Sequence, residues 1–242
     1  MRVAYITSQA ESRAGWGRYT VEVVKGARER GIEPVLITCG GGVDPDLQDV
    51  ECHDFLPPVL SRRLETPRSL LYAPRLRKIL ETCDVVHVIV ELYAPLTALA
   101  LPRNMPFVLS VFGTWAIRPL ENPWQRRFFV PAFRRANRIL AISGYTRDRM
   151  KQLTDLSSIE VLAGGVHPQL FQAQVDESEL PEWVGKAPMV LSVGAVKARK
   201  GQDIAVEAIA LVREHFPDVH YAIAGNYDEQ PEFISQLRSR IT

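Results

Sequence analysis

The chain has 242 residues, of which 46% are hydrophobic and 24% are charged, and its formal net charge is +1. These values are typical of a soluble globular protein with one large core or two smaller ones. The near-neutral charge argues against a protein that binds nucleic acid through bulk charge, and no apolar run is long enough to span a bilayer.

The start of the chain and its cysteines indicate the compartment. Met1 leads straight into an apolar strand, whereas a secretory signal peptide begins with charged and apolar regions. The three cysteines, Cys39, Cys52 and Cys83, are odd in number and lack the spacing of metal ligands. We therefore expect a cytoplasmic protein with reduced thiols and without a metal site.

The first part of the chain has the pattern of a Rossmann-type unit. Residues 3–7 and 35–38 are expected strands, and between them a helix opens at residues 14–20 and runs to about Arg30. Gly15 and Gly17 lie where the helix opens, but the third glycine of the dinucleotide fingerprint is missing and no acidic residue closes the second strand. Binding of a nicotinamide dinucleotide is therefore disfavoured. The glycines either admit a phosphate close to the backbone or serve tight packing, and we expect packing for at least one of them.

The middle of the chain alternates expected strands and helices. The strands are predicted at residues 50–56, 84–90, 107–112, 139–143 and 159–162. A helix over residues 68–80 carries Arg75, Arg77 and Lys78, with Arg62 and Arg63 before it, and we interpret these residues as a solvated basic face. His87, inside a predicted strand, fits a hydrogen-bonded interior histidine better than a ligand.

A helix predicted at residues 123–137 interleaves aromatic residues with arginines. The aromatic residues are Trp124, Phe128, Phe129 and Phe133, and the arginines are Arg126, Arg127, Arg134 and Arg135. This composition suits an interfacial helix that touches anionic lipid. It also suits a core helix whose arginine stems cover its flanks. We prefer the core interpretation, because Pro131 interrupts the pattern and the aromatic rings suit packing on a sheet.

Residues 189–226 read as strand, cationic turn, helix and strand. The strands are predicted at residues 189–193 and 219–224. The turn carries three cations and two flanking glycines: Lys197, Arg199, Lys200, Gly194 and Gly201. Because helix N-termini at the carboxyl ends of parallel strands attract anions, the turn indicates a phosphate or diphosphate site. A solvated basic loop is the alternative, and position alone favours neither.

The sequence Gly194-Ala-Val-Lys-Ala-Arg-Lys-Gly201 resembles the donor-side motif of GT-B glycosyltransferases of family 4. In that family the lysine before the second glycine, here Lys200, binds the diphosphate of a nucleotide sugar. The family often has an arginine directly after the first glycine, where this chain has Ala195. The resemblance then implies that Arg199 or Lys197 supplies the second cationic contact.

Further segments resemble the same family in the same order. They are the strand Asp84-Val-Val-His87 with Glu91 after it, the strand end at Phe112-Gly113, the run Ser143-Gly-Tyr-Thr-Arg147, and Gly164-Gly165-Val-His167 near the hinge, where His167 replaces the usual aspartate. Phe112 stands where family members commonly have a histidine close to the sugar. Because a phenyl ring cannot shuttle protons, the chemistry either relies on donor phosphate and backbone groups alone or is weakened, and we favour the first interpretation.

The resemblance implies a set of site residues and assigns no catalytic residue. On the donor side they are Lys200, Arg199, Gly194 and Lys197. On the acceptor side of the cleft they are Gly15, Trp16, Gly17, Arg18, Glu91, Phe112, Gly113, Ser143, Arg147 and Gly165.

The resemblance also implies an α/β fold of GT-B type, with a Rossmann-like amino-terminal domain followed by a truncated second Rossmann-like domain. We assign residues 1–172 to the acceptor-side domain, residues 173–188 to a linker and residues 189–242 to part of the donor domain. The paired glutamates that hold the donor sugar in the family would lie beyond Thr242. We therefore expect the chain as given to be an incomplete fragment without transferase activity.

The implied function is metal-independent transfer of a sugar, of hexosyltransferase type, from a nucleotide-diphosphate sugar to a glycan, lipid or small-molecule acceptor, as in glycan biosynthesis. The nucleotide sugar is a substrate, and no cofactor is expected. Expected locations are the cytoplasm and the inner face of its membrane, through peripheral contact, and nucleic acid is not expected as a partner. The alternative is a non-catalytic nucleotide-sugar or phosphosugar binding module, which Ala195 and Phe112 support.

Overall fold

The computed structural model describes residues 1–12, 15–58, 65–156, 158–166, 168–172, 176, 178, 180–227 and 230–241. The chain divides into two compact units, Met1–Val166 and His167–Thr242, so the first unit ends before the boundary predicted at residue 172. Arg62 and Arg63 of the predicted basic face, and His167, lie outside the described residues. No helix among the described residues is both long and apolar enough to cross a membrane.

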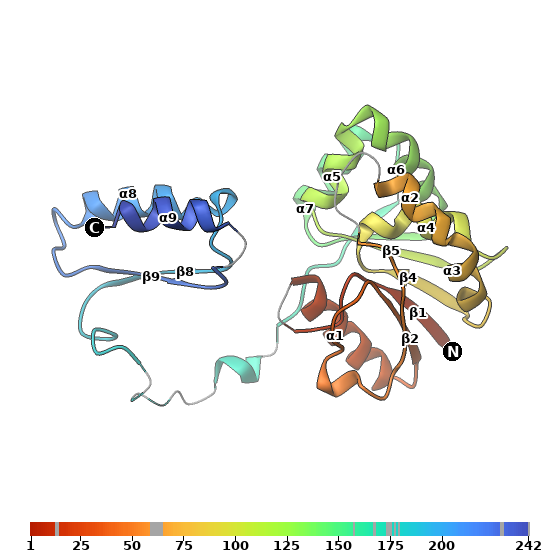
Figure 1. The fold of residues 1–242 in the computed structure, drawn as a ribbon, viewed down its shortest axis with the longest axis horizontal. Helices are drawn as coiled ribbons and strands as arrows, with labels where there is room; N and C mark the ends of the chain where they lie inside the picture. Colours follow the sequence, from red (N-terminus) through yellow and green to blue (C-terminus); the bar gives the residue numbers. More distant parts are fainter. Residues whose placement is uncertain are drawn as a thin grey trace. The chain divides into compact units, whose positions relative to one another are not determined.

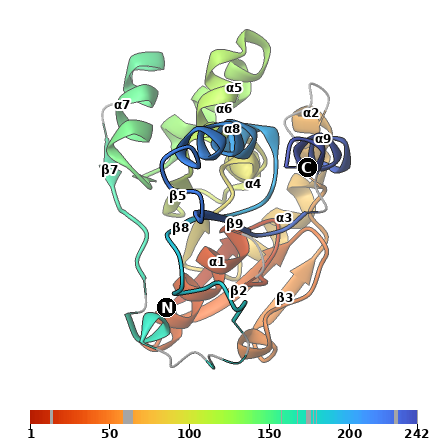
Figure 2. The ribbon, with the colours of Figure 1, turned by 90° about the vertical axis from the view of Figure 1, so that its left-hand side faces the viewer.

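The first unit is built on one seven-stranded sheet in the order β3-β2-β1-β4-β5-β6-β7, and every neighbouring pair is parallel (Figure 1). The strands are β1 (Arg2–Ile6), β2 (Glu33–Thr38), β3 (Glu51–Asp54), β4 (Val85–Val88), β5 (Phe107–Val111), β6 (Arg138–Ala141) and β7 (Ile159–Val161). Figure 2 shows β3 at the outer edge of the sheet beside β2. The order reverses between β1 and β4, and ligands of such sheets bind outside the carboxyl ends of the strands at this point.

Seven helices of the first unit lie in its described residues. They are α1 (Gly15–Arg28), α2 (Glu65–Ser69), α3 (Ala73–Leu80), α4 (Ala94–Ala100), α5 (Thr114–Glu121), α6 (Pro123–Arg135) and α7 (Gly144–Leu153). Successive residues of β1 point to opposite faces of the sheet. Val3 and Tyr5 join a core with α1, whereas Ala4 and Ile6 join a larger core with α3, α4, α5 and α6. Both faces of the central strands are therefore buried, which explains why β1, β2 and β5 are mostly apolar. The edge strands β3 and β7 are largely exposed.

The structure corrects three details of the helices. The helix predicted at residues 68–80 is broken into α2, a 3-10 turn over Leu70–Tyr72 and α3, because Pro74 lies in the first turn of α3 and cannot donate a backbone hydrogen bond. Gly113, predicted at the end of a strand, is the N-cap of α5, and Trp115 lies in the first turn of that helix. Helix α4 was not predicted from the sequence.

Helix α6 agrees with the core interpretation on one of its faces. Phe129 and Phe133 are buried in the large core, at 1% and 0% exposure, and their rings meet edge to face at 5.8 Å. Trp124, Arg127 and Phe128 lie on the rest of the helix, where Arg127 is exposed and the two rings are half-buried. The preference for a core helix therefore accounts for only part of the pattern.

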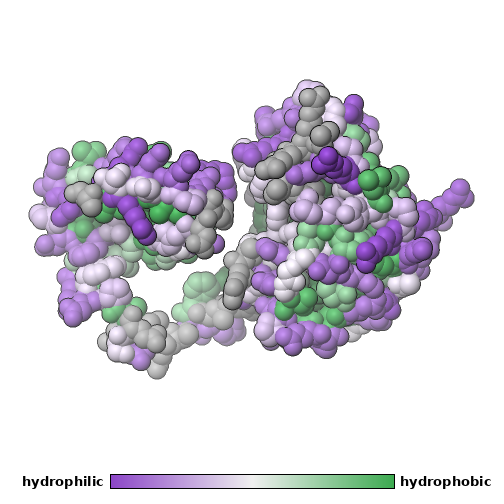
Figure 3. Space-filling model, in the orientation of Figure 1, coloured by the Kyte–Doolittle hydropathy of each residue, from purple (hydrophilic) through white to green (hydrophobic). Residues whose placement is uncertain are grey.

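The second unit follows the predicted order of strand, turn, helix and strand. It contains β8 (Met189–Val193), α8 (Gln202–Val212), β9 (His220–Ala224) and α9 (Pro231–Ser239), with β8 and β9 parallel. In Figure 1, α8 and α9 lie on the same side of the β8–β9 pair. Hydrophobic residues reach the surface of this unit, among them Val193, Ile204 and Leu211 at 78%, 68% and 66% exposure (Figure 3). Its described residues thus leave apolar surface on both the sheet and α8 uncovered.

Candidate functional site

Glu91 opens the 3-10 turn Glu91–Tyr93 that follows β4, at the carboxyl edge of the sheet beside the reversal of strand order. Its side chain is fully buried. Oε1 accepts a hydrogen bond of 2.8 Å from the backbone N–H of Phe112, while Oε2 has no partner among the described residues. Burial raises the pKa of Glu91 to about 8, against which the hydrogen bond from Phe112 acts only in part. The carboxyl group is therefore mostly protonated at neutral pH.

Phe112 and Gly113 connect β5 to α5 at the same edge. The φ angle of Gly113 is 71°, in the left-handed region that favours glycine, and its carbonyl accepts hydrogen bonds from the N–H groups of Ala116 and Ile117. The ring of Phe112 meets that of Tyr19 on α1 edge to face, with centroids 4.9 Å apart. The side chain at the family's histidine position is thus a packing group against α1.

The first turn of α1 places Gly15, Trp16, Gly17 and Arg18 at this edge. A Cβ atom on Gly17 would overlap the backbone carbonyl of Glu11, whereas no described atom lies within 4 Å of the Cβ position on Gly15. Gly17 is therefore required for the close approach of the Glu11 backbone. The described atoms leave the space beside Gly15 empty. Arg18 forms an ion pair of 2.8 Å with Glu22 on its own helix.

Trp16 also meets a residue that the sequence did not single out as a site residue. Its ring lies 5.8 Å from that of Trp115, the second residue of α5, at an interplanar angle of 49°. Trp115 lies two residues after Gly113, a predicted site residue, but no sequence pattern indicates its contact with Trp16. The two rings bring the beginnings of α1 and α5 together.

Ser143 and Arg147 lie at the start of α7, after β6. The Oγ of Ser143 caps the helix by accepting the N–H of Thr146 at 3.2 Å, and the Oγ1 of Thr146 lies 3.5 Å from the Cβ position on Gly113. Arg147 pairs with its neighbour Asp148 at 2.7 Å and is partly exposed. The loops after β5 and β6 are therefore adjacent, as their common edge of the sheet requires.

Gly165 follows β7, and no described atom lies within 4 Å of the position that its Cβ would take. The residues predicted for the acceptor side thus all lie after strands of one sheet or at the start of α1. Their part in binding an acceptor stays a prediction.

The turn after β8 is held by backbone contacts with the end of β9. The N–H groups of Gly194 and Val196 donate to the carbonyls of Ala224 and Asn226, both at 2.8 Å. A Cβ atom on Gly225 would overlap the backbone carbonyl of Gly194. The N–H of Gly194 therefore serves the sheet, and this hydrogen bond limits its predicted role as a donor to a bound diphosphate.

Side chains also contact the turn after β8. Val196 is fully buried against Ile234 and Leu237 of α9. The Nε2 of Gln202 donates to the carbonyl of Ala195 at 3.2 Å, and the Oε1 of Gln230 accepts the N–H of Ala198 at 3.0 Å. No pattern in the sequence indicated a role for either glutamine. Together these contacts hold the turn in one conformation.

The cations of the turn lie at the start of α8. Arg199 and Lys200 are exposed and Lys197 is half-buried. The Nζ of Lys200 lies 3.8 Å from the Cβ position on Gly194, so its side chain folds back over the end of β8. Gly201 caps α8 with a left-handed φ of 68° and provides no side-chain hydrogen bond to the first turn. The structure therefore places Lys200 beside Gly194 at the N-terminus of α8, and the part of these residues in binding a diphosphate stays a prediction.

Among the described residues, no three histidine, cysteine, aspartate or glutamate side chains form a group that could hold a metal ion. The three cysteines are free, and burial raises the pKa of each thiol. Thiolate chemistry is therefore not favoured at any of them near neutral pH.

Comparison with known proteins gives one family match. The profile of Glycosyltransferase Family 4 matches residues 13–170, which is most of the chain. No curated protein matches the sequence significantly.

Solved structures match the fold over nearly the whole chain. HepE of Anabaena, in complex with UDP and glucose, gives a TM-score of 0.72 at 17% sequence identity, over 99% of this chain and 65% of that chain. A glycosyltransferase from Rickettsia africae gives 0.65 at 17% identity, over 99% and 64% of the two chains. The lipopolysaccharide outer core galactosyltransferase WaaB gives 0.62 at 14% identity, over 99% and 65%.

These matches confirm the predicted α/β fold of GT-B type. This chain spans only about two thirds of the length of each matched structure, with 65% of HepE covered.

Proposed function

The chain belongs to glycosyltransferase family 4, and we propose that its protein transfers a sugar from a nucleotide-diphosphate sugar to an acceptor without a metal ion. The turn between β8 and α8 binds the diphosphate of the donor. HepE has been solved with UDP and with UDP-glucose, which makes uridine diphosphate sugars the first donors to test. The acceptor side is the carboxyl edge of the seven-stranded sheet.

The position of Lys200 carries this proposal. Lys197, Arg199 and Lys200 set three cations against one carboxylate, Asp203, at the first turn of α8. The partial positive charge of the helix N-terminus adds to these cations. A diphosphate placed there meets fixed charge and free N–H groups on a turn that is already held rigid, so little ordering is needed on binding.

The same groups assist the reaction. When the bond between the sugar and the diphosphate breaks, negative charge grows on the leaving diphosphate. Cations and a helix N-terminus fixed beside it stabilise this charge in the transition state. Phe112 supplies no proton on the acceptor side, so the proposed chemistry relies on donor phosphate and backbone groups.

We expect Lys200→Ala to weaken binding of UDP to the full-length protein about tenfold or more, because one charge-assisted hydrogen bond contributes about 1.5–3 kcal/mol. Lys197→Ala is the matched control, since it removes the same charge from the same turn, and its loss should be much smaller. Lys200 folds over Gly194 beside the N-terminus of α8, whereas Lys197 precedes the 3-10 turn Ala198–Lys200. Calorimetric titration of both variants measures the difference. Equal losses, or no loss from Lys200→Ala, would contradict the site.

A binding module without catalysis is the second candidate, because Ala195 and Phe112 replace charged or polar residues of the family. The two functions differ in turnover. Full-length protein that is stabilised by a UDP-sugar in a thermal-shift screen, yet neither transfers nor hydrolyses it, would favour the module.

We also expect the 242 residues alone to bind UDP weakly and to transfer no sugar. The supporting observation is the apolar surface left uncovered on β8 and α8, where Val193 and Ile204 are 78% and 68% exposed. Holding the anomeric carbon against the acceptor is a large share of catalysis, and we expect it to require more of a donor domain than the strand pair and two helices that the structure describes in the second unit. Transfer of sugar by the purified 242-residue chain would contradict this expectation.

A further inference from the structure

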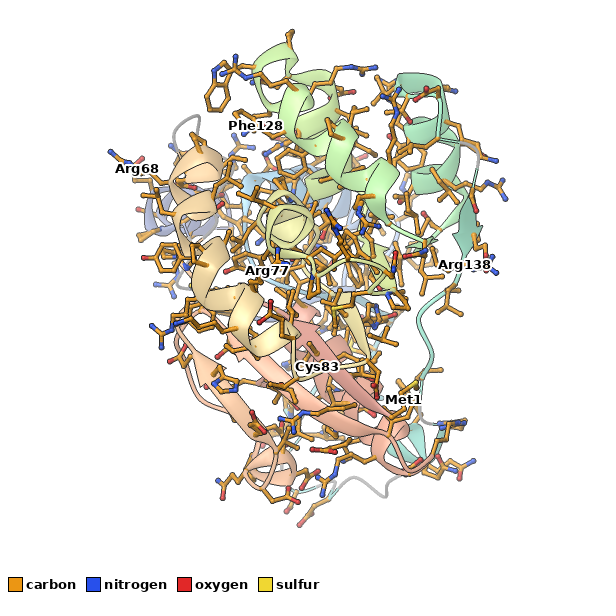
Figure 4. All side chains as sticks on the ribbon, turned by 90° about the vertical axis from the view of Figure 1, so that its right-hand side faces the viewer. Met1, Arg68, Arg77, Cys83, Phe128 and Arg138 are labelled. Atoms are coloured by element: carbon orange, nitrogen blue, oxygen red, sulfur yellow. The ribbon has the colours of Figure 1, made fainter. Side chains whose placement is uncertain are left out.

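Helices α2, α3, α4 and α6 form one layer on the sheet face opposite α1. α4 lies in the middle of this layer, in contact with α2, α3 and α6. We call the outer side of these four helices, with the 3-10 turn Leu70–Tyr72, the basic face. Figure 4 labels one residue from each of three of its helices: Arg68 extends outward from α2, Arg77 lies on α3, and Phe128 lies on α6.

The basic face concentrates positive charge. The four helices contain eight basic residues and one acidic residue: Arg68, Arg75, Arg77, Lys78, Arg126, Arg127, Arg134 and Arg135 against Glu65. The net charge of the whole chain is only +1, so the rest of the chain is net negative. Positive charge is therefore concentrated on these four helices, and the net charge of the whole chain does not reveal it.

Most of these charges are not neutralised within the first unit. Arg77 pairs with Glu81, and Arg134 pairs with Asp155. The other six form no ion pair with any described residue, although Arg126 donates to the carbonyl of Leu120 and Arg75 lies over the ring of Phe55. The remaining four are exposed and available to an anionic partner: Arg68, Lys78, Arg127 and Arg135.

Apolar side chains lie among the cations. Leu71, between α2 and α3, is 79% exposed, and Leu99, on the outer side of α4, is 57% exposed. On α6 the guanidinium group of Arg127 lies 4.8 Å from the ring centroid of Trp124 and 5.0 Å from that of Phe128, whose rings meet each other at 5.3 Å. Aromatic rings with a cation over them, beside exposed leucines, are typical of the boundary between headgroups and acyl chains.

We propose that the basic face docks on a membrane surface rich in anionic lipid. The cations bind lipid phosphates, while Leu71, Leu99 and the ring edge of Phe128 enter the boundary of the acyl chains. A nucleic acid would satisfy the cations but would leave the exposed leucines in water, so lipid fits the surface better. This inference is independent of the donor site and goes beyond the proposed transfer reaction.

The experiment measures binding of full-length protein to vesicles of phosphatidylcholine alone and of phosphatidylcholine mixed with phosphatidylglycerol. Binding should require the anionic lipid and should fall as salt rises from about 0.1 M to about 1 M, where charges on the surface are screened. Arg127→Glu should lower the partition constant about tenfold or more, because each charge near such a surface contributes about a fivefold factor.

Arg30→Glu is the matched control, because it reverses one exposed charge at the end of α1, on the opposite sheet face. It should change vesicle binding less than twofold, because salt screens a charge that lies farther from the membrane than about one Debye length. Leu99→Ser keeps all charges and should also weaken binding. Since both Arg127 and Leu99 are exposed, unchanged thermal midpoints will show that the variants are folded.

Three outcomes would overturn the proposal. The first is binding that does not depend on anionic lipid. The second is an equal effect of Arg127→Glu and Arg30→Glu. The third is binding of a DNA or RNA duplex that depends on Arg127, without binding to either vesicle, which would make the basic face a nucleic-acid surface.

Discussion

Glu91→Gln should make the protein more stable than the wild type at pH 9 and should change its stability little at pH 5. Glutamine keeps an oxygen that accepts the N–H of Phe112 and resembles the protonated carboxyl group in shape and charge. Above pH 8 the wild type must hold a buried carboxylate with one unpartnered oxygen, and the variant does not.

The sign follows from the pKa of Glu91, which is about 8 in the folded protein against an ordinary value of 4.5. Between these values the folded state binds one proton more than the unfolded state, so the free energy of unfolding falls as pH rises. This contribution is complete below pH 4.5 and is lost by the time the pH passes 8. A shift of this size corresponds to at most roughly 5 kcal/mol, at about 1.4 kcal/mol per pH unit.

Chemical denaturation of both proteins from pH 5 to pH 9 measures the effect as a difference between two curves. Burial lowers the pKa of His87 to about 4, so this histidine makes the wild type less stable as pH falls from 6.5 to 4. Because both proteins keep His87, its contribution cancels in the difference. Glu29→Gln removes an exposed carboxylate at the end of α1 and should leave the curve parallel to that of the wild type. Parallel curves for Glu91→Gln would show that the carboxyl group is not held neutral.

A buried neutral acid at this place also has a structural consequence. Glu91 orders the connection from β5 to α5 through the N–H of Phe112, and that connection carries Gly113 and Trp115. Glu91→Ala would leave this N–H without its acceptor, at a cost of about 1–3 kcal/mol. Glutamine should restore the loss, which separates hydrogen bonding from charge.

Much of the fold could be predicted because buried parallel strands are continuous apolar runs. Each predicted strand of the first unit overlaps an observed one, as residues 84–90 overlap β4 (Val85–Val88). Helix α5 was harder, since Pro119 lies inside it and hides it from a pattern-based prediction. There the tertiary packing of an apolar face outweighs the local propensity. Pro95 lies in the first turn of α4, where proline is tolerated, so it does not account for the missing prediction of that helix.

The candidate site could be predicted only where a residue's role depends on its neighbours in sequence. The arrangement of Lys200, Gly201 and the start of α8 is local, and the structure has it as expected. The protonation of Glu91 depends on what surrounds it in space, and the sequence gives no sign of it. The hydrogen bond from the N–H of Ala198 to the Oε1 of Gln230 joins residues 32 positions apart, and no pattern predicts such a pair.

Gly225→Ala should abolish measurable binding of UDP by the full-length protein, although Gly225 carries no charge and is not itself a predicted donor-side residue. A methyl group on Gly225 would overlap the carbonyl of Gly194 and would press on the N of Ala195 at 3.1 Å. These are backbone atoms of the donor turn, and they cannot rotate away as a side chain can. Such overpacking costs about 1–3 kcal/mol and is relieved only if β8 and β9 separate at this end.

That separation would break the hydrogen bonds from Gly194 to Ala224 and from Val196 to Asn226, both 2.8 Å long. Lys200 would then no longer lie over the end of β8. The variant would keep this positive charge, but the charge would no longer be positioned to contact a bound diphosphate. Calorimetric titration with UDP and a thermal midpoint measure binding and stability in the same samples. Gly26→Ala, inside α1, is the control, because its Cβ would meet only the end of the Arg30 side chain at 3.6 Å. In a helix interior this change should preserve binding and raise stability by about 0.5–1 kcal/mol. If Gly225→Ala bound UDP as tightly as the control, the backbone contact between the ends of β8 and β9 would not be what positions the cations.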